Sequence, residues 1–457
     1  MTDVLVGAAT GNITPEIGVP MGGYGARQGM STGVHDRLLV RTIVFSDGSA
    51  DLAICVCDLV GVGAEIVRRS RELAASELGI PASNVLVAAT HTHSGPLDVK
   101  SAEPTPYTEK VAREVVRSIR EARERRQPVS LKAGTVEVTT ISQNRRDPAG
   151  PIETTATVLV ATPLDPAAGS RAVATLVNYA CHSTVLEHDN MEYSPDFPGA
   201  MARFLEREVG GTAVYLQGAA GNINPVWMRH DFAEVERVGG ILGAAATRVV
   251  HELAPLGHGQ WCINLSWSQN VPKESDGTLL GVSSLRATQV LVELPRREIR
   301  SQADIRTEMD GLESDRSAAG TDVERHHALT ARLNQLRIEW LAAGRLAEGA
   351  APPGAAAVEI QAMRIGDECA IVTLPGEFFV ETGQAIRASA GLPQLLVAGY
   401  ANGMIGYVPP AEAFGLAGYE VGRAEFEPAA ERAISEAAVA AVRSLYSADA
   451  AALAVGR

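Results

Sequence analysis

The sequence predicts an α/β protein with a mixed β-sheet core flanked by helices. Short apolar runs of strand length alternate with amphipathic helical patterns through the first half of the chain. Several of these runs stop at a loop rich in His, Gly or Asn. The composition, with 46% hydrophobic and 21% charged side chains among 457 residues, is typical of a globular chain with a substantial core. Because ligand sites in open α/β sheets lie beyond the carboxyl ends of strands, we expect these loops to converge on one crevice.

The individual elements follow from length and periodicity. Bounded apolar runs predict strands, and apolar positions that recur every three or four residues predict helices. In the first half the expected strands are 39–45, 52–59, 85–90, 172–180 and 212–217, and the expected helices are 64–78 and 108–126.

The second half of the sequence has a different pattern of apolar and charged residues. Residues 295–350 contain long charged helical patterns at 305–317 and 323–345, which we interpret as a helical insertion with solvated faces inside a single catalytic domain, 1–457. His326 and His327 fall on different sides of that helix and are expected at the surface. After an Ala/Pro/Gly linker at 349–356, strands are expected at 358–365 and 369–374, and a last helix at 428–445.

Charge and targeting signals narrow the function classes. Forty basic against 54 acidic side chains leave a net charge of −14, which repels polyanions, so no nucleic-acid partner is expected. The amino terminus has no signal-peptide pattern and no apolar run is long enough to span a bilayer, so we expect a cytoplasmic protein without stable membrane association. The five cysteines are scattered, and disulfides are not expected.

The tetrapeptide His91-Thr92-His93-Ser94 directly follows the apolar run 85–90. Residues two apart on a strand share a face, so both imidazoles are expected to leave the strand on the same side. Such a pair can begin a metal site, although two histidines in a polar turn are the alternative.

Three later runs also end at a chemically capable group. The run before Cys181 ends at His182, the run 213–217 leads into the loop 218–225, and the run 371–374 delivers Glu377 after a Pro-Gly turn. Singly, each could be a packed core histidine, an ordinary loop residue or a loop carboxylate.

Taken together and in order, these motifs resemble the neutral ceramidases. The residues that carry the resemblance are the opening segment 7–15, Thr90 to Pro96, Asn144-Arg145, Cys181 to Thr184, Gly221 to Pro225, Pro375-Gly376-Glu377, and the segment with Tyr407 and Tyr419. The similarity runs to about Glu427, and the family's carboxyl-terminal immunoglobulin-like domain has no expected counterpart.

The resemblance implies one catalytic Zn²⁺. Its implied ligands are His91, His182, Glu377 and Tyr407, and the tyrosine is matched because the family's second active-site tyrosine follows twelve positions later, as Tyr419 does here. Neutral imidazoles, a carboxylate and a weakly bound phenol suit this ion.

The resemblance also implies the catalytic residues around the ion. His93 corresponds to a histidine that orients substrate or shuttles a proton, Arg145 to an arginine that contacts a substrate hydroxyl, and Tyr419 to a hydrogen-bond donor for the carbonyl oxygen. Asp58 and Asp196 are candidates for fixing ligand tautomers, with loop capping as the alternative.

One position departs from the family. Ceramidases carry an essential serine in a Gly-Asp-x-Ser-Pro turn, whereas this chain has Gly221-Asn222-Ile223-Asn224-Pro225. An amide cannot be an acyl-accepting nucleophile, so we expect direct attack by activated water, with Asn224 positioning that water or supporting the oxyanion.

The expected function is therefore a zinc-dependent hydrolase of an amide bond in a small soluble N-acyl or lactam-type substrate rather than ceramide. A Gly-rich loop, 21–27, is expected to line the pocket, with Arg27 or Arg145 able to bind a carboxylate or hydroxyl. A zinc-dependent esterase or lactonase and a non-catalytic ligand-binding homologue remain alternatives. Homo-oligomer formation is left open, as is a second metal, for which Gly33-Val34-His35-Asp36 is the candidate.

Overall fold

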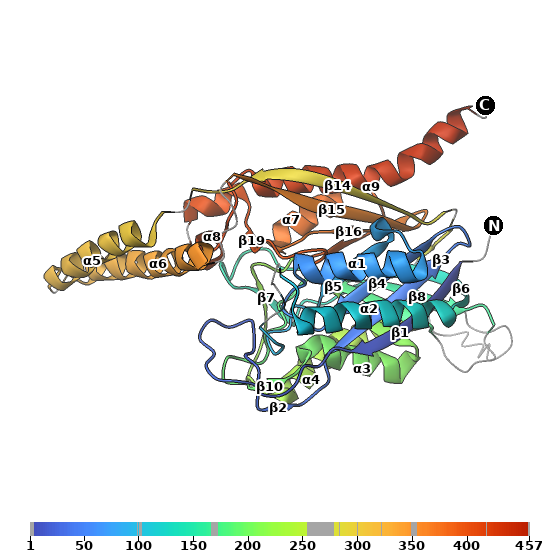
Figure 1. The fold of residues 1–457 in the computed structure, drawn as a ribbon, viewed down its shortest axis with the longest axis horizontal. Helices are drawn as coiled ribbons and strands as arrows, with labels where there is room; N and C mark the ends of the chain where they lie inside the picture. The colour runs from blue at the N-terminus through green and yellow to red at the C-terminus, as the bar shows by residue number, and fades with distance from the viewer. Residues whose placement is uncertain are drawn as a thin grey trace, which may run out of the picture.

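The computed structural model describes residues 4–97, 99, 103–165, 172–253, 278–282, 284–298, 300–320, 322–348, 354–416 and 418–455. The α/β class expected from the sequence is confirmed (Figure 1). Elements of strand and helix alternate through residue 253, and a second set of strands and helices follows.

The large sheet has nine strands. Their order is β11-β9-β8-β6-β1-β3-β4-β5, and β13 pairs with β6 off this path. The strands are β1 (Leu5–Asn12), β3 (Leu39–Ser46), β4 (Asp51–Cys57), β5 (Val85–Ala89), β6 (Gln127–Glu137), β8 (Thr155–Pro163), β9 (Ala174–Tyr179), β11 (Thr212–Gln217) and β13 (Thr278–Leu279).

This sheet is mixed. The pairs β4 with β5 and β9 with β11 are parallel, and the other described pairs are antiparallel. β5 and β11 stand at the two ends of the strand order, yet their residues contact each other. The side-chain amide of Gln217, which ends β11, also donates to the carbonyl of Thr90, just after β5. The sheet is therefore curled, and its two edges meet at their carboxyl ends.

A smaller sheet lies against the first. It contains four strands in the order β14-β15-β16-β18, with ranges β14 (Arg286–Pro295), β15 (Ala355–Gly366), β16 (Cys369–Thr373) and β18 (Gln394–Ala398). Short two-stranded pairs complete the β structure, formed by β2 (Gly33–Val34), β7 (Ser142–Asn144), β10 (Glu192–Tyr193), β12 (Ile223–Pro225), β17 (Glu377–Phe378) and β19 (Tyr407–Val408).

Helices cover the outer faces of both sheets. The longer ones are α1 (Ala64–Leu78), α2 (Pro106–Glu124), α3 (Asp196–Val209), α4 (Phe232–Leu253), α5 (Gln302–Ala318), α6 (Val323–Glu348), α7 (Val380–Ala390) and α9 (Ala430–Val455). The short ones are α8 (Tyr419–Gly422) and the 3₁₀ turns η1 (Ala82–Asn84) and η3 (Ala411–Leu416). Among the described residues, no helix has the length and apolar character that crossing a membrane requires.

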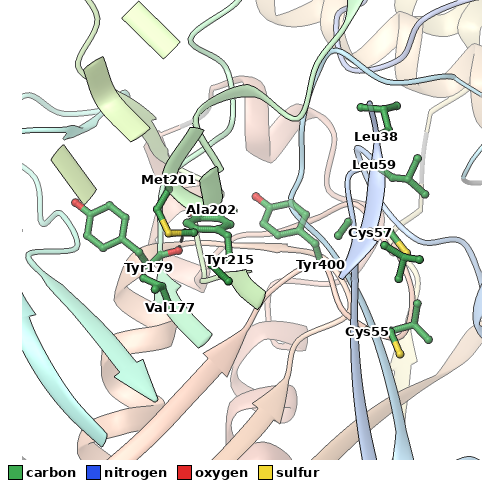
Figure 2. Packing of buried hydrophobic residues seen from close by; sticks show 14 of the residues in the cluster. Leu38, Cys55, Cys57, Leu59, Val177, Tyr179, Met201, Ala202, Tyr215 and Tyr400 are labelled. Carbon is green, nitrogen blue, oxygen red and sulfur yellow. Dashed lines mark hydrogen bonds between the residues drawn. The ribbon is translucent and has the colours of Figure 1, made fainter. Parts of the chain in front are cut away.

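Three apolar clusters define the layers. One packs helices α1 to α4 against the large sheet, a second lies between the two sheets, and a third packs α7 and α9 against the small sheet. Figure 2 shows part of the first cluster, in which Tyr400 lies between Tyr179 and Tyr215 on one side and Cys55 and Cys57 on the other. The four described cysteines are buried thiols without disulfides, as expected, and Cys262 lies outside the described residues.

The helical insertion consists of two helices, α5 and α6, which lie side by side and project from one end of the molecule (Figure 1). Its own small core contains Ile305, Met309, Leu333 and Leu336. His326 and His327 are exposed, as predicted for a solvated face. The last helix is longer than expected, because α9 continues from Ala430 to Val455 rather than ending near residue 445.

Candidate metal centre and active site

His91 follows β5 in a left-handed backbone conformation, with φ of 63°. Non-glycine residues rarely adopt this region, and such strain concentrates at functional sites. The imidazole is buried, with 1% exposure, and its Nδ1 lies 2.6 Å from the carbonyl oxygen of Val60. Because Nδ1 donates to this carbonyl, Nε2 carries the lone pair and faces the interior of the site.

His182 follows β9 and mirrors this arrangement. Its Nδ1 lies 2.6 Å from the carbonyl oxygen of Ala220, and the side chain has 0% exposure. A β-bridge between Thr92 and Ser183 holds the two histidine loops together. Burial, followed by the charge of Arg145, lowers the pKa of His182, so the ring is neutral and able to act as a ligand.

Glu377 follows β16, the strand of the small sheet that ends at Thr373. It opens β17, which pairs in parallel with β19 so that Glu377 is the direct partner of Tyr407. Its Oε2 lies 3.6 Å from Nε2 of His91 and 3.5 Å from Nε2 of His182. A carboxylate and two imidazole nitrogens therefore face one another around a single point.

Tyr407, the strand partner of Glu377, supplies the fourth candidate ligand, its phenol oxygen. The residue is buried, and burial, followed by the charge of Glu377, raises its pKa well above the ordinary value. Its Oη accepts a hydrogen bond of 2.9 Å from Nη2 of Arg145.

The guanidinium of Arg145 is fixed by several hydrogen bonds. Its Nε donates to Oε1 of Glu420 at 2.8 Å, and its Nη2 also donates to the carbonyl of Gly221. Burial acts to lower the pKa of Arg145, but the charges of Tyr407 and Glu420 outweigh it and raise the pKa. Nη1 lies 3.4 Å from Oδ1 of Asn224, the residue that stands at the position of the serine in the Gly-Asp-x-Ser-Pro turn.

His93 stands beside the other two imidazoles. Its Nε2 lies 3.2 Å from Nε2 of His91, and its ring meets the rings of His91 and Tyr24 edge-on. One ring nitrogen from each of His91, His93 and His182 lies within 4.8 Å of the others. A ligand set of three histidines is therefore a geometric alternative to the set that includes Glu377 and Tyr407.

The donor set fits a divalent zinc-like ion. His182 is neutral and buried, and its Nε2 faces Oε2 of Glu377 at 3.5 Å. An imidazole nitrogen buried in this way suits coordination, and the adjoining carboxylate supplies negative charge. The described ranges contain one such group of three candidate ligands, His91, His93 and His182.

A cavity of about 400 Å³ opens beside this centre. The residues that line it are Gly23, Tyr24, Gly25, Ala26, His93, Arg145, Thr184, Glu187, Asn224, Trp227, Tyr407 and Tyr419. Tyr419 is 43% exposed and packs its ring edge-on against that of Tyr407. Gly23 is required here, because its φ is 98° and a Cβ would lie 2.5 Å from Cγ of His93.

The Gly-rich loop lines this cavity as expected, but Arg27 does not face a substrate. Its guanidinium donates to four backbone carbonyls, those of Gly22, His93, Glu187 and His188. The suggestion that Arg27 binds a substrate carboxylate is therefore wrong, because the side chain is already used to fix the loop beside His93.

The two outer carboxylates also do not fix ligand tautomers. Asp58 accepts from the backbone amide of Leu39, and Asp196 accepts from the amides of Val185, Leu186 and Phe197. Both are loop caps, the alternative left open by the sequence, and backbone carbonyls orient the imidazoles instead. Burial raises the pKa of each carboxylate to about 6.

His35 and Asp36 form a local pair away from the centre. His35 lies 2.9 Å from Oδ2 of Asp36 and stacks on Phe232. No third candidate ligand joins them among the residues that the structure describes. Glu420, Trp227 and Tyr400 surround the site but carry no local sequence signal, since only the tertiary fold brings them there.

Comparisons with known proteins identify relatives of this chain. Residues 4–275 match the family described as neutral/alkaline non-lysosomal ceramidase, N-terminal. The chain is 29% identical over 240 residues to a neutral ceramidase of Mycobacterium tuberculosis, a match that covers 47% of this chain but 37% of that protein.

Solved structures show the same fold over nearly the whole chain. The neutral ceramidase from Pseudomonas aeruginosa superposes with a TM-score of 0.72 and 21% identity, covering 98% of this chain and 75% of that one. A second structure, described as ceramidase complexed with C2, gives a TM-score of 0.70 at 20% identity, with 97% and 75% covered. With the family match covering more than half of its residues, this chain belongs to the neutral/alkaline non-lysosomal ceramidase family.

Proposed function

We propose that this chain is a zinc-dependent hydrolase that cleaves an amide bond of a small N-acyl or lactam-type substrate. The observation that carries the proposal is the convergence of His91, His182 and Glu377, whose nitrogen and oxygen atoms lie 3.5 to 3.6 Å apart around one point. These three residues, with Tyr407, would hold the ion. A bound Zn²⁺ would supply a polarised carbonyl and a water whose pKa falls towards neutrality.

The chain's own residues would perform the proton transfers. His93 lines the cavity and stands beside the ligand histidine His91, so its imidazole can accept a proton from the attacking water and return it to the departing nitrogen. The C–N bond then breaks as the proton reaches nitrogen, giving a carboxylic acid and an amine, and the acid passes its remaining proton to the amine or to solvent. No acyl-enzyme is required, in keeping with Asn224 in place of serine.

Asn224 and Tyr419 would stabilise the developing oxyanion. Because Oδ1 of Asn224 faces the donor Nη1 of Arg145, its Nδ2 is the atom left to donate towards the cavity. Tyr419 lines the same cavity and offers a phenol as a second donor. Donors held in place before reaction are the most effective form of such stabilisation.

Arg145 would act on Tyr407 rather than on a substrate anion. Its donors already engage Glu420, Gly221, Tyr407 and Asn224. One N–H of Nη1 is left over, so Arg145 could offer a substrate a single hydrogen bond but not the bidentate pair that binds a carboxylate most strongly.

The cavity volume supports a small substrate. A space of about 400 Å³ lies at the small end of the range for ligand sites, which is about 300 to 1,000 Å³. A two-chain lipid would have to extend beyond it, into the neighbouring cavity of about 890 Å³ that shares Arg145 and Tyr419 with it. The aromatic rings of Tyr24, Trp227 and Tyr419 suit a compact apolar group next to the scissile bond.

Metal analysis and a substrate panel test the proposal. We expect about one zinc per chain in protein purified without added metal, as for a single catalytic site, and loss of both metal and turnover in His182→Ala. Matched amides and esters should give a higher kcat/KM for the amides. A preference for esters would favour the esterase alternative, and tight ligand binding without turnover would favour the non-catalytic one.

A further inference from the structure

Tyr400 lies behind the imidazoles, outside the residues that line the cavity. Its ring stacks on His91 with centroids 4.0 Å apart and an interplanar angle of 26°. The same ring meets His182 edge-on at 6.3 Å and 87°. The side chain has 0% exposure, and Figure 2 shows it packed near Tyr215 in the cluster under the site.

The backbone around Tyr400 joins the strands that deliver two of the proposed ligands. The amide of Ala89, at the end of β5, donates to the carbonyl of Tyr400, and the amide of Tyr400 donates to Gly376, next to Glu377. Two residues on, Asn402 exchanges hydrogen bonds with Val87 of β5, through its own amide at 2.7 Å and through Oδ1 at 3.0 Å.

This connection is strained. Tyr400 has φ of 54° and Asn402 has φ of 59°, both in the left-handed region. Asparagine tolerates this region, but a tyrosine is held there only where its surroundings enforce it. His91 is strained in the same way, so the stacked pair consists of two residues held out of their ordinary backbone conformations.

The hydroxyl of Tyr400 does not account for the presence of a tyrosine at this position. Its Oη is buried and makes no hydrogen bond to any described residue. A buried hydroxyl without a partner is unfavourable, so stability alone would select phenylalanine. The contact that the side chain does make is between its ring face and the imidazole of His91.

We propose that Tyr400 is a positioning residue whose ring fixes the plane of His91 and so aims its Nε2 at the point shared by His182 and Glu377. The Val60 carbonyl sets only the direction of Nδ1, and rotation about that hydrogen bond would still tilt the ring. Stacking on Tyr400 restricts this tilt. The inference rests on the proposed metal centre.

Cobalt binding tests this role without using turnover. Co²⁺ titrated into the metal-free protein reports affinity, and its visible absorption bands report ligand geometry. Tyr400→Phe keeps the ring and should bind Co²⁺ with unchanged affinity and spectrum. Tyr400→Leu removes the ring face and should weaken Co²⁺ binding by about 10- to 100-fold, the usual cost of losing a residue that orients a ligand.

A matched control separates positioning from packing. Phe45→Leu removes a buried ring from the cluster between the two sheets, away from the histidines. It should lower the melting temperature while leaving the cobalt spectrum and affinity unchanged. If Tyr400→Leu does not fold, Tyr400→Met fills similar volume without a ring face and takes its place in the titration.

The outcomes are distinct. Wild-type Co²⁺ affinity and spectrum in a folded Leu or Met variant would overturn the positioning role, while leaving the metal centre intact. Weakened binding in Tyr400→Phe would overturn it as well, because the hydroxyl would then matter. Absence of Co²⁺ and Zn²⁺ binding in the wild type would refute the metal centre itself.

Discussion

Arg145 donates a 2.9 Å hydrogen bond from Nη2 to the phenol oxygen of Tyr407. This contact links β19, which supplies Tyr407, to the loop after β7, which supplies Arg145. Arg145 is in turn fixed by Glu420, whose carboxylate also binds Arg146. The orientation of Tyr407 thus depends on a carboxylate on α8.

Glu420→Gln should reduce kcat/KM by about tenfold or more, because Arg145 loses its charged partner and no longer holds Tyr407 in one orientation. Breaking a buried ion pair should also lower the free energy of unfolding by about 3 kcal/mol. Steady-state kinetics and chemical denaturation measure the two effects.

Glu153→Gln is the matched control. Glu153 is buried and paired with Arg387 on α7, outside the cavity. This variant should lose comparable stability and keep its kcat/KM. Equal losses of kcat/KM in both variants would show that Glu420 contributes to the fold alone.

His93→Ala should retain about one zinc per chain while turnover falls by about 10²- to 10⁴-fold, the contribution of a positioned acid or base. The reason is that Glu377 and Tyr407 complete the ligand set without it. Elemental analysis beside kinetics provides the measurement. Loss of the zinc in His93→Ala, with retention in Glu377→Gln, would instead identify the three-histidine set.

Asn224→Ala should lower kcat by about 10²-fold, as expected for removal of one oxyanion donor. Zinc content should not change, because Asn224 is outside the proposed ligand set. Gln143→Ala offers a control on the partner strand, since Gln143 is paired with Asn224 in the β12/β7 ladder and its side chain donates to the carbonyl of Pro225. A wild-type kcat in Asn224→Ala would remove this residue from the mechanism.

Metal removal should destabilise the protein. A ligand that binds only the folded state stabilises it by about 4 kcal/mol at a thousandfold excess over Kd. Adding zinc to chelator-treated protein should therefore raise the melting temperature, and His182→Ala should show no such rise. An equal rise in that variant would mean that zinc binds elsewhere.

Asp196→Asn should become relatively more stable than the wild type as the pH rises. Burial raises the pKa of Asp196 from 3.8 to about 6, so the folded state holds this proton more tightly than the unfolded state. The carboxylate begins to cost stability above the unfolded value and costs most above the folded one. Between about pH 4 and about pH 7, the free energy of unfolding of the variant should rise relative to that of the wild type by up to about 3 kcal/mol.

Asparagine tolerates the left-handed backbone of position 196, where φ is 58°, so strain adds no pH-dependent effect. Denaturation curves at several pH values provide the measurement. A pH-independent difference between the two proteins would show that folding does not shift the pKa of Asp196.

Local sequence patterns determined the elements on which the site is built. Helix α1 and strand β11 begin and end where periodicity placed them, because an amphipathic period and a bounded apolar run are properties of neighbouring residues. The order of short motifs also identified the family, and His91, His182, Glu377 and Tyr407 do converge.

Only the tertiary structure decided which groups face the centre and which support it. The edges of the large sheet meet because it curls, and this closure brings β5 beside β11 although they are far apart in strand order. Long-range packing likewise sends Arg27 to backbone carbonyls, places Glu420 on Arg145 and lays Tyr400 on His91. A sequence specifies the chemistry of each side chain. The partners of a buried polar group are decided by the tertiary structure, because a buried polar group must form its hydrogen bonds with the groups that the fold places next to it.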